Sequence, residues 1–333
     1  MAKPHSLPVQ PVWRRHVQRG FTLIEMMISI TIGLGILAGL VGVLATNSSN
    51  AKTNDRTSEL LTNGRYALNS IRQELREAGF RAYTWAEPIV PAPLGLATAD
   101  NECLEGGATQ GDFVSNLRQG VWGSNDANPF SGTCIPNASY VANTDVLVVR
   151  RLAVTPATVL AANTVYFETT YEKGQVFRGT GLPTWATTAP IPVPLASFAV
   201  QIYVYYISPF TVSAAESPLV PALYRVALLP DGSMARELVA SGIERMQVQY
   251  GQLTTALTTS YVDTFVCANC TSFNPGASTW DEVNSVRIWL LARNATPEPG
   301  YVNTTTYAMG SQPYTVNDNF RRQLFSSVVQ LRN

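Results

Sequence analysis

The sequence predicts an α+β protein with one long N-terminal helix packed on a large, antiparallel, β-rich globular domain. Residues 21–45 are apolar or weakly polar except Glu25, and a run of about 25 such residues is long enough to cross a bilayer as one helix. Apolar side chains then recur with a helical period as far as Gly79. Beyond Gly79, runs rich in Val, Tyr and Ile alternate with turn residues, which is typical of strands.

The N-terminal tail and the apolar run together predict a single membrane pass. The first 20 residues hold no acid but four basic side chains: Lys3, Arg14, Arg15 and Arg19. Positive-inside bias therefore places the tail in the cytoplasm and the rest of the chain in the periplasm. A carboxylate such as Glu25 costs roughly 2.5–3.5 kcal/mol within a membrane helix. Residues 21–45 contain no Lys or Arg, so this acid requires a cationic partner from elsewhere.

The segment Gly20-Phe21-Thr22-Leu23-Ile24-Glu25 resembles the class III prepilin signal of type IV pilins and type II secretion pseudopilins. The resemblance implies that a prepilin peptidase cuts after Gly20 and methylates the new N-terminus, Phe21. It also implies that Glu25 pairs with the free N-terminal amine of a neighbouring subunit and so sets the register of assembly. Residues 1–20 are then a cleaved leader, and residues 21–45 are the transmembrane and assembly half of the helix.

Two other interpretations of the N-terminus compete with this one. An ordinary secretory signal has an apolar core of about 7–15 residues followed by its cleavage site, so it would require a cut near Ala45. A plain signal anchor would hold a periplasmic domain to the membrane and tolerate Glu25.

Residues 46–79 are predicted to continue the helix as an amphipathic half. One face is apolar, and its members are Leu61, Leu68, Ile71, Leu75 and Ala78. The opposite face is polar, and its members are Asn63, Arg65, Asn69, Arg72, Glu74 and Glu77. Gly64 costs about 1 kcal/mol in mid-helix, which predicts a close packing contact there. Gly79 followed by Phe80 indicates the end of the helix, and four glycines of the membrane half, Gly33, Gly35, Gly39 and Gly42, permit close helix approach in lipid.

The globular domain is predicted to span residues 80–333, with a loop-rich region at 83–140. Strands are expected at 146–149, 165–168, 198–207, 222–229, 234–239, 243–250, 286–291 and near 321–333. Pro230-Asp231-Gly232-Ser233 lies between two of these runs and predicts a hairpin turn.

Several segments resemble the minor pilins called PilW. They are residues 63–68 and 76–81 at the end of the helix, and residues 237–244, 246–251, 285–291 and 322–333 in the globular domain. The resemblance implies a type IV pilin-like fold and is weak over residues 83–220.

The chain has four cysteines: Cys103, Cys134, Cys267 and Cys270. An even number in an oxidising compartment favours disulfides, and local pairing, Cys103 with Cys134 and Cys267 with Cys270, is the expected one of three connectivities. A redox CxxC motif at Cys267 and a four-cysteine zinc site are the alternatives.

Composition argues against several classes of function. Both histidines, His5 and His16, lie in the leader, so the mature chain would lack histidine-dependent catalysis and histidine metal sites. The formal net charge is zero, which argues against nucleic acid as the main partner. We therefore expect no enzymatic activity, cofactor or metal, although loops 83–140 and 251–280 leave ligand or calcium binding open.

The resemblance implies a minor pilin that helps to initiate type IV pilus assembly within a tip or priming complex. Its partners would be other minor and major pilins, the prepilin peptidase, the inner-membrane assembly platform and a tip adhesin. The chain would pass from the inner membrane to the pilus at the cell surface. A J-type pseudopilin of type II secretion is the alternative function, and a membrane-anchored periplasmic enzyme or an adhesive module is a more distant one.

Overall fold

The computed structural model describes residues 20–84, 89–90, 98–183, 190, 193–253, 262–268, 270, 280 and 283–331. The chain divides into two units, one up to Asp55 and one from Arg56 to Asn333. The predicted leader lies outside the described residues except for Gly20.

Helix α1 extends from Leu23 to Arg76 and holds 54 residues. It is long and apolar enough to cross a membrane, as judged from length and composition. The helix ends three residues before the predicted stop because its last turn tightens: the N–H groups of Glu77 and Ala78 bond to carbonyls three residues back. Gly79 has a positive φ of 76° and donates its N–H to the Arg150 carbonyl at 2.9 Å, so it redirects the chain as expected of a terminating glycine.

The larger sheet has eight strands in the described residues. Their bounds are β1 Ile89–Val90, β2 Val121–Ser124, β3 Val146–Leu152, β4 Val165–Thr169, β5 Gly174–Arg178, β6 Ala196–Ser208, β7 Ala222–Leu228 and β8 Met234–Ser241. Strand β6 organises the sheet: it pairs with β4 near its start and with β3 and β7 further along. All pairs are antiparallel except β1 with β5.

A second sheet has the strand order β10-β9-β11-β14, and its neighbours are antiparallel. The bounds are β9 Ile243–Leu253, β10 Val262–Val266, β11 Val283–Arg293 and β14 Arg322–Gln330. A separate hairpin joins β12 Thr306–Met309 to β13 Gln312–Thr315. Two short helices, α2 Asp112–Ser115 and a 3₁₀ turn at Asn137–Ser139, lie in the predicted loop-rich region.

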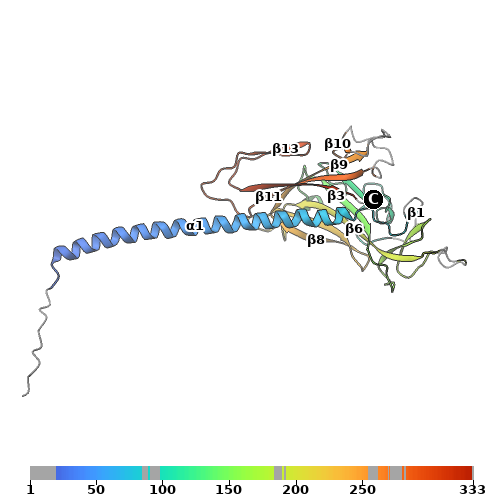
Figure 1. Cartoon of the computed structure of the whole chain (residues 1–333), viewed down its shortest axis with the longest axis horizontal. Coiled ribbons are helices and arrows are strands. Elements are labelled where there is room, and N and C mark those ends of the chain that lie inside the picture. Colours follow the sequence, from blue (N-terminus) through green and yellow to red (C-terminus); the bar gives the residue numbers. More distant parts are fainter. Residues whose placement is uncertain are drawn as a thin grey trace, which may run out of the picture. The chain divides into compact units, whose positions relative to one another are not determined.

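The second unit contains two hydrophobic cores. The first core joins α1, through buried residues such as Ile71 and Leu75, to both sheets, for example Tyr205 on β6 and Ile288 on β11. In Figure 1 this half of α1 lies along the strands. The second core contains side chains of the larger sheet, such as Phe167, together with Phe130 and other residues from the region before β3. The predicted fold class, one long helix and a large β domain of mainly antiparallel strands, is confirmed.

Most predicted strands overlap observed ones, and the hairpin at 230–233 joins β7 to β8, with Gly232 at a positive φ of 80°. Sequence analysis missed β1, β2, β5, β10, β12 and β13, all of them five residues or shorter. On the predicted polar face of α1, the Glu74 side chain is only 12% exposed, because Arg151 covers it.

Candidate functional site

The N-terminal motif begins α1 in the first unit. Gly20, Phe21 and Thr22 precede the helix, and Phe21 is 84% exposed. The Glu25 carboxylate accepts the Thr22 N–H at 2.9 Å and the Thr22 hydroxyl at 2.8 Å, while the Thr22 Oγ1 accepts the Glu25 N–H at 3.3 Å. These reciprocal bonds form a capping box.

Thr22 is thus a residue of the motif whose role the sequence analysis did not identify. The signal was the Thr-x-x-Glu spacing at the start of an apolar run, which is the sequence mark of a capping box. The box also means that Glu25 has a local task, since it satisfies an N–H group that the helix cannot satisfy itself. Among the described residues, the glycines of the membrane half have no close contact: a Cβ added at Gly33, Gly35, Gly39 or Gly42 would meet nothing within 4 Å.

In the second unit, the C-terminal part of α1 is held by a chain of charges and rings. Arg151 on β3 contacts Glu74 at 2.7 Å and Glu77 at 2.8 Å. The guanidinium groups of Arg151 and Arg225 both lie over the Tyr203 ring on β6, at 6.0 and 4.6 Å from its centroid. Arg225 on β7 in turn pairs with Glu237 on β8 at 2.8 Å. The chain of contacts connects the helix to four strands of the larger sheet.

Gly64 lies where α1 meets β14. A Cβ at Gly64 would lie 2.1 Å from the Phe325 ring, so the ring occupies the space that a side chain would need. The packing contact predicted for this mid-helix glycine is confirmed, with Phe325 as its partner.

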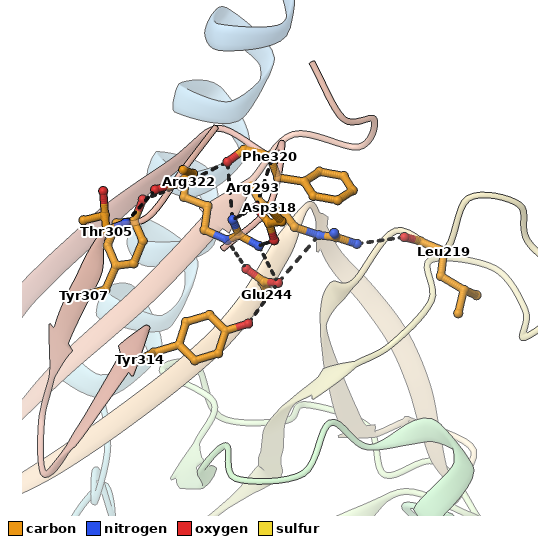
Figure 2. Close-up of polar contacts among 10 residues, drawn as sticks. Leu219, Glu244, Arg293, Thr305, Tyr307, Tyr314, Asp318, Phe320 and Arg322 are labelled. Carbon is orange, nitrogen blue, oxygen red and sulfur yellow. Dashed lines mark hydrogen bonds and ion pairs between the residues drawn. The ribbon is translucent and has the colours of Figure 1, made fainter. Parts of the chain in front are cut away.

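A second polar cluster joins the C-terminal strands (Figure 2). Arg322 contacts the Glu244 carboxylate at 2.6 and 3.1 Å and donates two bonds of 2.6 Å to Asp318. Arg293 lies 4.0 Å from Glu244, donates to the Leu219 carbonyl at 2.8 Å and stacks 4.2 Å above the Phe320 ring. The cluster therefore ties β9, β11 and β14 to the segment between β13 and β14.

Burial and ion pairing have opposite effects on the pKa values of the two arginines in this cluster. The Arg322 side chain is 1% exposed, and burial alone would lower its pKa, but the bonds to Asp318 and Glu244 hold that pKa above its ordinary value. The bond from Arg322 lowers the pKa of Asp318. For Arg293, burial outweighs the Coulomb attraction of Glu244 and lowers the pKa. The two guanidinium groups and the two carboxylates thus form an ion-pair network.

The structure joins Cys103 to Cys134 and Cys267 to Cys270, with Cα–Cα distances of 4.8 and 5.5 Å. This is the local pairing expected from the sequence. Cys103 and Cys134 lie in the second core, and Cys267 follows β10. Across the described residues, no group of three or more His, Cys, Asp or Glu side chains is placed to hold a metal ion.

Two family models match this chain, one near its N-terminus and one over its C-terminal part. Residues 15–41 match the model of the prokaryotic N-terminal methylation motif, which covers Gly20, Phe21 and Glu25. Residues 204–333 match the family model PilW, described as type IV pilus-assembly protein W, and this region contains the Glu244–Arg322 cluster.

No curated protein matches the chain at a significant level. Among solved structures, a type IV-like pilin from Thermus thermophilus resembles it at 14% identity and a TM-score of 0.31, over 84% of this chain and 96% of the pilin.

Proposed function

We propose that this chain, a type IV pilin-like protein of the PilW family, is a minor pilin that helps to initiate pilus assembly. The observation that carries the proposal is the position of Glu25, five residues after Gly20 at the start of an apolar helix, in front of a PilW domain. Membrane anchoring by a single helix follows from the motif and from the composition of α1.

The mechanism is physical rather than chemical. Cleavage after Gly20 frees the Phe21 amine, which is then methylated, and Glu25 of an incoming subunit pairs with that amine on a neighbour. A charge buried alone costs several kcal/mol, so both charges enter the fibre core only where they meet. The globular domain then contacts other minor pilins, in a priming complex that also carries a tip adhesin.

The capping box allows a matched pair of variants. Glu25→Ala removes the carboxylate, whereas Thr22→Val removes a capping hydroxyl and leaves the carboxylate in place. In the pilus-forming host, we expect both variants to be cut after Gly20. The amount of Glu25→Ala in sheared pili should fall, and that of Thr22→Val should remain near wild type.

Mass spectrometry of the exported N-terminus and immunoblots of sheared pili provide the two measurements. A chain that starts with methylated Phe21 supports the proposal, and a cut near Ala45 would overturn it. Equal incorporation of Glu25→Ala and wild type would show that the carboxylate serves only the helix cap.

A further inference from the structure

The outer edge of strand β14 has the properties of a docking surface. All nine residues of β14 pair with β11 in one register without a shift. In the described part of the chain, no strand pairs with β14 on its other side. An unpaired edge of this length is a template for another extended chain, because it presents a row of free N–H and C=O groups.

The hydrogen bonds at the two ends of the β11–β14 pair show which β14 residues bond to β11 and which direct their backbone groups to the outer edge. Leu331 donates its N–H to the Asn284 carbonyl at 2.8 Å, and Asn294 donates to the Arg321 carbonyl at 3.0 Å. Residues that pair in this way alternate with residues whose backbone groups point away from the partner strand. The odd-numbered residues of β14 therefore face β11, and Leu324, Ser326, Val328 and Gln330 direct their backbone groups outward.

After Arg322 at its start, β14 contains none of the features that protect an edge. Proteins blunt exposed edges with charged side chains, Pro, bulges or short strands, and residues 323–330 have no charged side chain, no Pro and no register shift. Other strands at edges do: β10 has a register shift between Val262 and Thr264, and β13 contains Pro313. The outward-facing Val328 is 52% exposed.

A groove of about 430 Å³ lies beside the C-terminal half of this edge. It is lined by Arg72 and Arg76 of α1 and by residues 328–331 of the β14 region, with no acid among its lining residues. Among the described residues, the Nε of Arg72 is buried without a hydrogen-bond partner, and the same guanidinium donates to the Asn69 side chain at 3.5 Å. The groove therefore favours a carboxylate, because two guanidinium groups line it without an acid and hydrogen bonds from Arg to a carboxylate are strong.

We propose that β14 binds an extended segment of another pilin subunit, which adds a fifth strand to the sheet and places an acidic side chain between Arg72 and Arg76. A second copy of this chain does not fit this role through its own β14, because residues 321–333 contain no Asp or Glu. The inference rests on the proposed function and deepens it by assigning a surface and a partner chemistry.

Val328→Pro tests the edge directly. Proline removes the outward N–H of Val328 but none of the bonds to β11, whereas Val328→Thr keeps that N–H and the branched shape. In the pilus-forming host, we expect Val328→Pro to be about tenfold scarcer in sheared pili, as for a lost hydrogen bond with an added clash. Val328→Thr should match wild type, and both variants should reach wild-type levels in the membrane.

A charge variant covers the case in which Val328→Pro fails to accumulate. Arg72→Glu with Arg76→Glu should lower incorporation to a similar extent, while Arg65→Glu, on an exposed part of the same helix, should not. Normal incorporation of an accumulated Val328→Pro, or of the Arg72 and Arg76 double variant, would overturn the inference. A deletion strain separates the two proposals: unchanged piliation without the chain would refute the proposed function, and lost piliation combined with normal edge variants would refute only the docking surface.

Discussion

Two adjacent arginines at the start of β14 occupy very different environments. The Arg322 side chain is 1% exposed and is enclosed by Glu244 and Asp318. Arg321 is 40% exposed and pairs with one carboxylate, that of Glu298, whose side chain is 16% exposed. Because the two side chains have the same chemistry, they allow the free energy of a buried ion pair to be compared with that of an exposed one in the same protein.

Arg322→Ala should lower the free energy of unfolding by roughly 3 kcal/mol, since it removes the buried guanidinium that Glu244 and Asp318 share. Glu244 would keep the Tyr314 hydroxyl at 3.5 Å and Arg293 at 4.0 Å. Arg321→Ala should cost under about 1 kcal/mol, as is usual for exposed pairs. Urea unfolding of the detergent-solubilised full chain, followed by tryptophan fluorescence, measures both values. Equal losses for the two variants would contradict the assigned difference in environment.

The sequence reveals some single-residue roles but not this cluster. Gly79 and the Gly232 turn follow from local backbone requirements, which a short stretch of sequence contains. Glu244, Arg293 and Arg322 are charged side chains in strand-like runs, and nothing local indicates that they meet. Their contact depends on the register of β11 against β9 and β14, which brings together residues up to 78 positions apart.

At the scale of elements, α1 is docked on the sheets by shape as well as by charge. Gly64→Ala should raise helix propensity by about 1 kcal/mol, but its Cβ would lie 2.1 Å from the Phe325 ring. Overpacking of this kind costs about 1–3 kcal/mol, so we expect a lower melting temperature. In the double variant Gly64→Ala with Phe325→Ala, the methyl group has room, and the substitution at Gly64 should become neutral or stabilising.

Gly132→Ala is the matched control for that cycle, because a Cβ at Gly132 would meet nothing within 4 Å. Its melting temperature should stay close to that of wild type. If Gly64→Ala destabilised the chain equally with and without Phe325, the contact between helix and strand would not be the cause.

Long, buried elements were predicted from the sequence more readily than short ones. Strand β6 has thirteen residues of strong β composition, and α1 has a sustained apolar period, so both were identified. β2 and β5 contain four and five residues with glycine among them, and their pairing with β3 and β4 supplies the stability that local propensity lacks.

At the scale of the whole molecule, the sequence predicts the class but not the strand order. The apolar run and the later strand runs fix a helix followed by a β domain. The order of the larger sheet depends on contacts such as β3 with β6, which lie about fifty residues apart in the chain and leave no local mark. The division of the β domain into two sheets was not predicted either.

Asp145, just before β3, links the two sheets. Its backbone N–H donates to the Met246 carbonyl at 3.1 Å, and its carboxylate accepts the N–H groups of Asp126 at 2.9 Å and Val248 at 2.6 Å. The residue is 1% exposed. Burial raises the pKa of Asp145 from 3.8 to about 7. The two backbone hydrogen bonds favour the charged form and lower this pKa, whereas the charge of Asp126 raises it slightly further.

This shift makes the stability of the joined sheets depend on pH. Because the folded state holds the proton more tightly than the unfolded state, Asp145 ionisation opposes folding increasingly as pH rises from about 4 to 7, and the penalty is constant above that range. The free energy of unfolding should thus gain up to about 1.4 kcal/mol per pH unit on acidification through this window, relative to Asp145→Asn, which does not titrate. Urea unfolding of both full-length chains at pH 5, 6, 7 and 8 measures the difference. Parallel pH profiles would show that Asp145 is already ionised at pH 5, in which case the two N–H bonds outweigh its burial.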